Sequence, residues 1–151
     1  MIPMQARFLG HVVWYVRSLD ASLRFYRDLF GFRKVGITFG GLAAALTAGR
    51  THHELLLIEV GHAPGPATGR RIGLYHIGIN IGNSLDALRA AKSELEQGGL
   101  AIDGMSDHTV SQILYLRDPD GNEVELYVDA ESVPWQDHPE LVLSPIRPLM
   151  L

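Results

Sequence analysis

Histidines and glutamates recur at matched positions in the two halves of this chain. Glu59 follows His11 by 48 residues, and Glu125 follows His76 by 49 residues. Two histidines with one or two carboxylates make a complete ligand set for Fe(II), Mn, Ni or Zn. The sequence has no cysteine, so any metal must be held by nitrogen and oxygen. The alternative is that each histidine is an ordinary half-buried polar residue, and the repeated spacing favours the metal.

These residues belong to an internal repeat. The stretches HVVWYVRSLDASLRFYRDLFGF (11–32) and HIGINIGNSLDALRAAKSELEQGGL (76–100) each read as an apolar strand that begins with a histidine, then Ser-Leu-Asp-Ala, an amphipathic helix and glycine. A duplicated unit of this length indicates two half-domains that pack on each other. Such packing would bring the two His–Glu pairs together.

The pattern of apolar residues predicts the order βαβββ twice, and hence an α+β fold of two tandem modules with a cupped mixed sheet and outer helices. We expect module 1 at about 5–61, module 2 at about 71–129, together one domain over 1–129, and a tail at 130–151 without regular structure. The expected elements are strands at 7–16, 33–39, 42–48, 53–60, 73–81, 100–106, 111–117 and 123–128, and helices at 21–29 and 85–97. Asp20 is the expected N-cap of the first helix. Asp118-Pro-Asp-Gly-Asn122 predicts a tight turn.

Side chains alternate along a strand, so the expected strands have two distinct faces. Ile77, Ile79 and Ile81 share one face with Tyr75, whereas His76 lies on the other face with Gly78 and Asn80. In the last strand, Val124, Leu126 and Val128 oppose Glu123, Glu125 and Tyr127. The apolar faces suit a core beneath the helices, and the polar faces suit a cavity.

Composition limits the class of protein. The chain has 151 residues, of which 46% are hydrophobic, and its formal net charge is -4 with only two lysines. That balance predicts no nucleic-acid partner, because a protein that binds nucleic acid usually carries a clustered basic face. No apolar run approaches the roughly 18 residues that span a bilayer, so we expect no membrane partner. The absence of cysteine and of a signal-peptide pattern favours the cytoplasm.

Four segments resemble the vicinal oxygen chelate superfamily, which includes glyoxalases, bleomycin-resistance proteins and extradiol dioxygenases. They are HVVWYVRSLDASLRFYRDLFGFR, HHELLLIEV, GLYHIGINI and YLRDPDGNEVELYV, and the resemblance covers about residues 7–129. It implies paired βαβββ modules and a divalent metal on the histidine of each first strand and the glutamate of the last strand. In this chain those ligands are His11, His76 and Glu125.

Within the superfamily, the chain most resembles the catalytic half of type I extradiol ring-cleaving dioxygenases. His53, His108 and Tyr115 match that family's catalytic positions, so the resemblance implies acid–base roles for the two histidines and a substrate hydrogen bond for the tyrosine. Most such dioxygenases contain two of these domains, whereas this chain contains one. The other histidines, His52, His62 and His138, are expected at the surface.

The resemblance implies a metal-dependent dioxygenase that opens a catechol-like aromatic with dioxygen. Fe(II) is the expected metal, with Mn, Ni or Zn as alternatives. Two other functions stay open. A glyoxalase- or isomerase-type enzyme would use Glu59 as a fourth ligand, and a bleomycin-resistance-type protein would bind a small molecule without catalysis. We also expect a homodimer, because several single-domain members build their sites between two chains and the tail is apolar enough to cover a partner.

Overall fold

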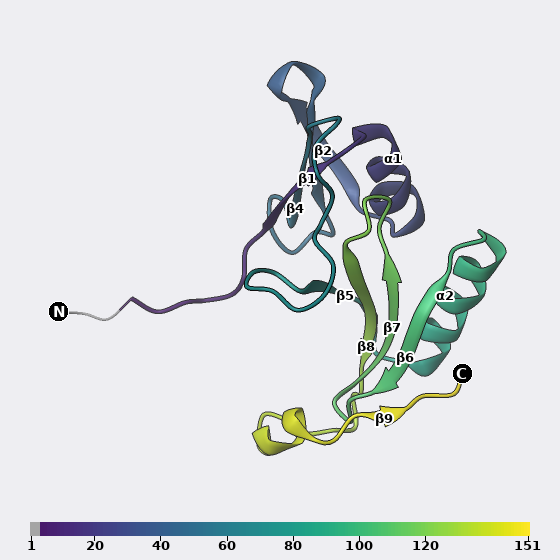
Figure 1. The fold of residues 1–151 in the computed structure, drawn as a ribbon. Coiled ribbons are helices and arrows are strands. Elements are labelled where there is room, and N and C mark those ends of the chain that lie inside the picture. The colour runs from purple at the N-terminus through teal and green to yellow at the C-terminus, as the bar shows by residue number, and fades with distance from the viewer. Residues whose placement is uncertain (1–3) are drawn as a thin grey trace. The chain divides into compact units, whose positions relative to one another are not determined.

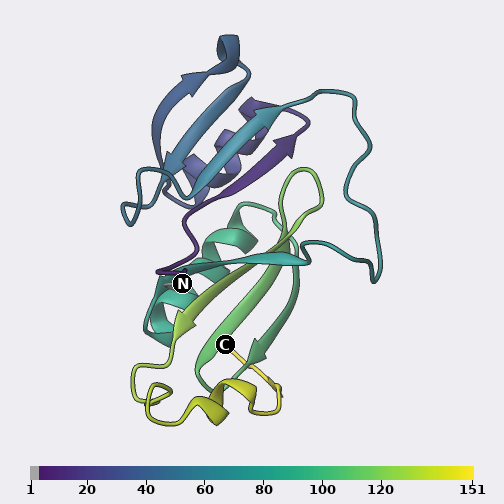
Figure 2. The same ribbon diagram turned by 90° about the vertical axis from the view of Figure 1, so that its left-hand side faces the viewer.

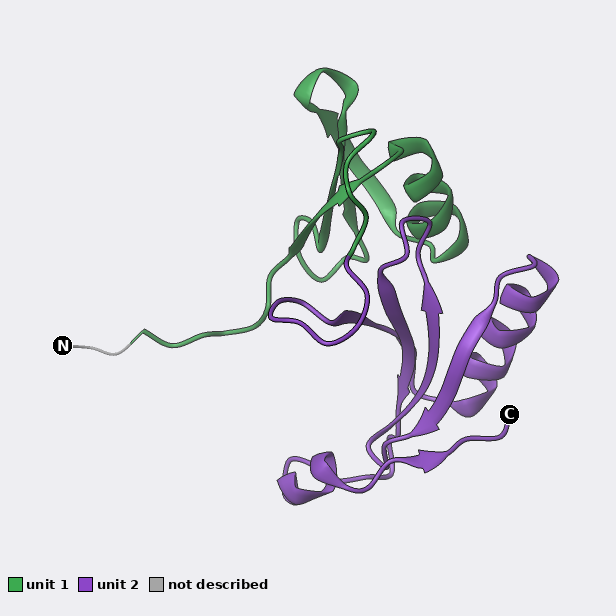
Figure 3. Ribbon diagram, in the orientation of Figure 1, with its two compact units in different colours: residues 1–66 green, residues 67–151 purple. Residues whose placement is uncertain are grey.

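Two copies of one strand–helix–strand arrangement follow each other along the chain, in a computed structural model that describes residues 4–151. The chain divides after residue 66 into unit 1 and unit 2 (Figure 3). Each unit has the order βαβββ and its own sheet, in which the first strand lies parallel to the fourth and the other neighbours are antiparallel. The α+β class and the tandem modules expected from the sequence are confirmed.

Unit 1 contains a four-stranded sheet in the order β1-β4-β3-β2, with one helical segment on its buried face (Figures 1 and 2). Its elements are β1 (Val12–Val16), α1 (Leu19–Leu23), a π-helical continuation η1 (Arg24–Leu29), β2 (Arg33–Thr38), the short turn η2 (Phe39–Gly41), β3 (Ala43–Thr47) and β4 (Leu55–Glu59). The first strand therefore begins at Val12, five residues later than expected, and His11 lies directly before it.

The first helix begins earlier than expected. Ser18 is its N-cap, since the Ser18 side chain accepts a hydrogen bond from the Ala21 backbone N–H at 3.3 Å. The expectation for Asp20 is wrong: Asp20 lies in the first turn, where its side chain pairs with Arg24 instead. Phe25 and Tyr26 of η1 are buried, so the helical segment supplies much of the core of unit 1.

Unit 2 contains a five-stranded sheet in the order β5-β8-β7-β6-β9, with α2 along one face (Figure 1). Its elements are β5 (His76–Gly82), α2 (Leu85–Gln97), β6 (Ile102–Asp107), β7 (Ser111–Arg117), β8 (Glu123–Asp129), the short helical turn η3 (Pro139–Leu143) and β9 (Arg147–Pro148). The expected helix at 85–97 is confirmed, with Ser84 as its N-cap.

The alternation expected for unit 2 is confirmed. Val124, Leu126 and Val128 are buried on the face that α2 covers, as is Leu88 of α2 itself. The turn between β7 and β8 also forms as expected, because buried Asp118 accepts hydrogen bonds from backbone and side-chain N–H groups of the residues that follow it. The polar face of the sheet is therefore left to Glu123, Glu125 and Tyr127.

The C-terminal tail is more ordered than the sequence indicated. It forms η3 and then β9, which pairs antiparallel with the edge strand β6 (Figure 1). The expectation of no regular structure is wrong here, since Arg147 and Pro148 register with Asp107 and Ser106. Across residues 4–151, no helix combines the length and the apolar character needed to cross a membrane.

Candidate metal and proton-transfer site

His76 lies between two carboxylates on the polar face of unit 2. The parallel register sets His76 beside Glu123 and Gly78 beside Glu125. The His76 Nδ1 atom is 3.1 Å from Glu123 Oε1, and the Nε2 atom is 3.2 Å from Glu125 Oε1. Gly78 leaves room beside Glu125, because a Cβ at residue 78 would lie 3.3 Å from the Tyr127 ring and 3.5 Å from the Glu125 carboxylate. The register of β5 and β8 therefore brings the His76 imidazole into contact with the carboxylates of Glu123 and Glu125.

Tyr115 lies directly opposite Glu125 in the antiparallel register of β7 and β8. Its hydroxyl is within 3.1 Å of both Ser106 Oγ and His108 Nε2, and His108 Nε2 is also 3.0 Å from Ser106 Oγ. These three polar groups form a closed triangle next to the Glu125 carboxylate. Burial and the charge of Glu125 raise the pKa of the Tyr115 phenol, although its hydrogen bond with Ser106 opposes the shift.

A tight turn directs the His108 side chain toward Ser106 and Tyr115. Thr109 adopts φ 71°, a conformation that is uncommon for a residue other than glycine. The Asp107 carboxylate holds the turn, since it accepts hydrogen bonds from the Thr109 backbone N–H at 2.8 Å and from Gln112 Nε2 at 3.1 Å. Strand alternation cannot predict the direction of a side chain on such a turn, and here the turn brings His108 to Tyr115.

Three imidazoles gather in unit 1. The His11 and His53 rings are 4.5 Å apart between centroids, and so are the His52 and His53 rings. His52 Nδ1 lies 2.5 Å from His53 Nδ1. Burial, with the nearby His11 and His52, lowers the pKa of His53, so the neutral imidazole is favoured. His52 is exposed, as expected, and its ring also belongs to this cluster.

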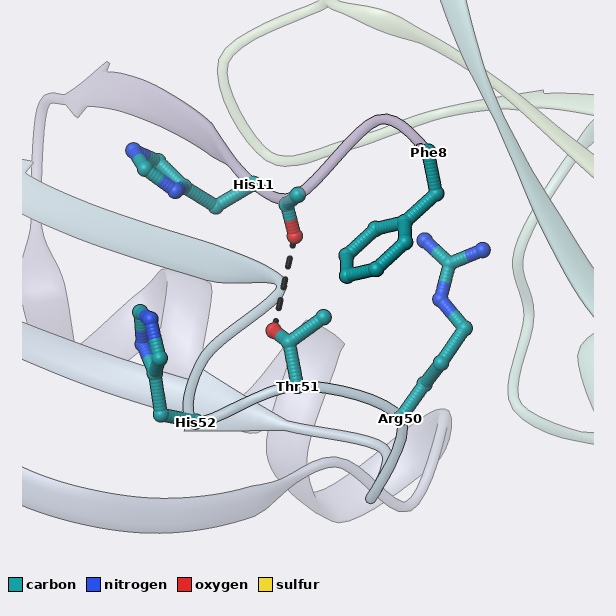
Figure 4. A pocket seen from close by; sticks show the side chains of 6 residues that line it. Phe8, His11, Arg50, Thr51 and His52 are labelled. Carbon is teal, nitrogen blue, oxygen red and sulfur yellow. Dashed lines mark hydrogen bonds between the residues drawn. The ribbon is translucent and has the colours of Figure 1, made fainter. Parts of the chain in front are cut away.

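His11 also lines a pocket of unit 1 (Figure 4). Thr51 donates a hydrogen bond to the Gly10 carbonyl across this pocket at 3.4 Å, and the Arg50 guanidinium lies 5.7 Å from the centre of the Phe8 ring (Figure 4). The segment before β1 is thereby tied to the turn before β4, which fixes the base of the His11 side chain.

Glu59, by contrast, faces the core side of the unit 1 sheet. It registers with Val16, whose side chain is buried, and its carboxylate accepts a 2.6 Å hydrogen bond from the Leu19 backbone N–H. Leu19 is the first residue of α1, where backbone N–H groups lack partners within the helix. The carboxylate therefore acts as a helix-capping group, which also complements the positive end of the helix dipole.

The register explains why the two spacings are not equivalent. In unit 2, Glu125 pairs with the residue two positions after His76. The corresponding residue in unit 1 is Val13, which pairs with Leu56. Because side chains alternate, spacings of 48 and 49 residues direct their glutamates to opposite faces. Leu56, an apolar residue, thus occupies the position in unit 1 that Glu125 occupies in unit 2.

The donors in unit 2 fit one side of a metal coordination shell. Two ligand atoms at about 2.1 Å from a metal and at a right angle lie about 3 Å apart, close to the 3.2 Å between His76 Nε2 and Glu125 Oε1. Within either unit, the described residues hold no group of three or more histidines and carboxylates arranged to bind a metal. Unit 2 by itself therefore offers a two-ligand site beside an acid–base cluster.

Sequence comparison finds relatives with dioxygenase and lyase names. The chain is 38% identical over 128 residues to a catechol-2,3-dioxygenase of Bacillus subtilis, covering 85% of this chain and 44% of that protein. It is 30% identical over 128 residues to a probable lactoylglutathione lyase of Synechocystis, covering 79% of this chain and 93% of that protein. The chain thus spans less than half the length of the Bacillus relative.

Solved structures share the fold. A glyoxalase/dioxygenase from Nostoc punctiforme superposes with a TM-score of 0.71 at 20% identity, covering 85% of this chain and 98% of the other. A glyoxylase/bleomycin resistance protein/dioxygenase domain from Frankia gives a TM-score of 0.70 at 21% identity, covering 89% of this chain and 99% of the other. Residues 8–126 match the sequence model of the Glyoxalase/Bleomycin resistance protein/Dioxygenase superfamily. With repeated βαβββ units and a match over most of its length, this chain belongs to that superfamily.

Proposed function

We propose that the chain is a metal-dependent dioxygenase of the extradiol ring-cleavage type, acting on a catechol-like aromatic. The ligands in this proposal are His11, His76 and Glu125, and the metal is Fe(II). In the overall reaction, the ring bond beside the vicinal hydroxyl groups breaks and both atoms of dioxygen enter the product. The observation that carries the proposal is the triangle of Ser106, His108 and Tyr115 next to the Glu125 carboxylate.

A bound divalent metal would supply Lewis acidity toward two vicinal oxygens and a coordination position for dioxygen. The chain's own residues supply the proton chemistry. The Tyr115 phenol, which burial keeps protonated, can donate a hydrogen bond to a substrate oxygen. The His108 imidazole, 3.1 Å from the same hydroxyl, can accept a proton from the substrate and later return it.

His53 has a second acid–base role in this proposal. Its lowered pKa makes the neutral imidazole the prevailing form near pH 7, so it would act as a proton acceptor and hydrogen-bonding group beside His11. Glu59 has no ligand role in the proposal, because its carboxylate caps α1 on the other face of the sheet.

A glyoxalase- or isomerase-type reaction is the second candidate. The Synechocystis relative favours it, because this chain covers 93% of the length of that protein. Leu56 argues against it, since a fourth ligand is missing at the position in unit 1 that corresponds to Glu125. The 38% identity to the Bacillus catechol-2,3-dioxygenase supports the first proposal over the second.

The test is anaerobic reconstitution with Fe(II) or Mn(II), followed by oxygen and a panel of catechols. Oxygen uptake coupled to formation of a yellow ring-fission product is the expected result. A protein that binds the metal and consumes no oxygen, yet converts a hemithioacetal, would establish the glyoxalase-type reaction instead. Binding of a drug-like molecule without any metal would indicate a bleomycin-resistance-type protein and overturn both enzymatic proposals.

A further inference from the structure

Glu123 is a buried carboxylate, and each of its two oxygens has a polar partner. Glu123 is 7% exposed, and it precedes Glu125 by two positions on the same face of β8. The Oε1 atom lies 3.1 Å from His76 Nδ1, and the Oε2 atom accepts a 2.9 Å hydrogen bond from Arg117. Removing such a carboxylate from water costs free energy, and well-ordered partners are needed to offset that cost.

Arg117 supplies an ordered partner. It lies directly opposite Glu123 across the β7–β8 pair, and its Nε atom donates a 2.8 Å hydrogen bond to Asp103 on β6. Arg117 is thereby fixed between two carboxylates, and their hydrogen bonds and charges raise the pKa of its guanidinium. The chain Asp103–Arg117–Glu123–His76 thus crosses the sheet from β6 to β5.

The contact with Glu123 determines which nitrogen of His76 can bind a metal. Glu123 occupies the Nδ1 side of the ring, so that the Nε2 atom is the one directed to Glu125. A carboxylate that accepts the Nδ1–H of a ligand histidine fixes the ring orientation and makes the other nitrogen a stronger donor. Substitution of such a partner typically weakens metal affinity about 10- to 100-fold.

We propose that Glu123 is a positioning residue that holds His76 ready to bind the metal through Nε2, and that Arg117 holds Glu123. This inference rests on the proposed metal-binding function. It goes further because it explains how one ligand is oriented by residues that touch neither metal nor substrate. A purely structural role for Glu123, as an ion pair that stabilises the β7–β8 hairpin, is the competing explanation.

Metal affinity separates these two roles. The experiment measures anaerobic Fe(II) binding by competition with a chromophoric chelator, for the wild type, Glu123→Gln, Arg117→Gln and Glu96→Gln. Glu96 is the matched control, because it is an exposed carboxylate that pairs with Lys92 on α2. We expect about 10- to 100-fold weaker binding for Glu123→Gln, a smaller loss for Arg117→Gln, and no change for Glu96→Gln. A folded Glu123→Gln protein that binds Fe(II) like the wild type would overturn the proposal.

Nuclear magnetic resonance of the wild type tests the same contact without any substitution. In nitrogen-15-labelled protein, with the His76 signal identified by its absence from His76→Gln, we expect a proton on Nδ1 both without metal and with Zn(II) bound. An unprotonated Nδ1 would contradict the inference even if Glu123→Gln failed to fold. A wild type that binds no metal but keeps the Nδ1 proton would refute the proposed function while upholding the His76–Glu123 hydrogen bond.

Discussion

The polar face of the unit 2 sheet carries a phenol, Tyr115, whose hydroxyl lies 3.1 Å from the His108 imidazole. Burial raises the pKa of the Tyr115 phenol, with the charge of Glu125 acting in the same direction. The phenol therefore remains a hydrogen-bond donor throughout the neutral pH range. In the proposed reaction, Tyr115 donates a hydrogen bond and His108 transfers a proton, so each side chain can be tested by substitution.

His108→Gln is expected to slow turnover of the proposed catechol substrate by about 10²- to 10⁴-fold, the usual contribution of a positioned acid or base. Tyr115→Phe is expected to slow it by about 10²- to 10³-fold, the contribution of one positioned hydrogen-bond donor. Fe(II) affinity should stay at the wild-type value, because neither side chain is a proposed ligand. Steady-state kinetics and the chelator competition measure the two effects. His138→Gln is the control, since His138 is exposed and contacts Glu140 in the tail. Loss of Fe(II) from Tyr115→Phe or His108→Gln would contradict the proposed roles.

Glu59 is predicted to matter for stability and not for metal binding. Glu59→Gln keeps an oxygen that can accept the Leu19 N–H but removes the negative charge at the start of α1, so unit 1 should lose about 0.3–1 kcal/mol of unfolding free energy. Denaturant titration measures this loss, and Glu131→Gln, at an exposed carboxylate of unit 2, is the control. If Glu59→Gln left stability unchanged but weakened Fe(II) or Ni(II) binding, Glu59 would be a ligand after all.

At the scale of elements, the tail and the His108 turn are linked. The Asp107 carboxylate accepts hydrogen bonds from the Thr109 N–H and from Gln112, and it pairs with Arg147 of β9 at 2.8 Å. Burial alone would raise the pKa of Asp107, but these hydrogen bonds and the charge of Arg147 outweigh it, and the pKa is lowered. The edge strand, the turn and the tail thus share one carboxylate.

Because of this carboxylate, the stability of unit 2 should fall in acid, which forms the acid limb of its curve of stability against pH. A lowered pKa in the folded state means that Asp107 stabilises the fold above the ordinary carboxyl pKa of about 4. The stabilisation is lost as pH falls through the lower, folded-state value. Asp107→Asn should cost about 1–3 kcal/mol at pH 7 and flatten the loss of stability between about pH 5 and 3. Unfolding midpoints measured across this pH range, with Asp129→Asn as control, test it; an unchanged acid limb would contradict it.

At the scale of the whole molecule, the chain contains one pair of βαβββ units, whereas it covers only 44% of the Bacillus catechol-2,3-dioxygenase. Exposed apolar side chains remain in both units and in the tail, among them Tyr15, Ile37, Leu143 and Ile146. Apolar side chains mark a contact between chains only where they gather into one patch. The homodimer expected from the apolar tail is therefore a prediction to be tested.

The predicted homodimer can be tested directly. Light scattering coupled to size-exclusion chromatography should give a mass near twice the 16.6 kDa of one chain at micromolar concentration. Leu143→Glu, on the exposed tail, should shift the mass toward that of one chain while leaving the circular dichroism spectrum unchanged. A wild-type monomer at micromolar concentration would refute the expectation.

Local patterns account for the parts of the fold that were predictable. The Ser-Leu-Asp-Ala repeat, the glycine-terminated helices and the Asp118–Asn122 turn depend on neighbours in sequence, and the α2 boundaries at Leu85 and Gln97 follow from them. The alternation of side chains along β8 also predicted that Glu123 and Glu125 share the polar face. It missed the role of Glu123 because the partners of that carboxylate, His76 and Arg117, come from two other strands.

The sequence by itself determined the βαβββ repeat, the buried faces and the identity of the histidines and carboxylates able to do chemistry. Only the tertiary structure decided the direction of Glu59, the pairing of β9 with β6 and the approach of His108 to Tyr115. The physical reason is that alternation is a property of one strand, whereas register joins residues dozens of positions apart. A shift of one residue in that register moves a side chain to the opposite face of the sheet.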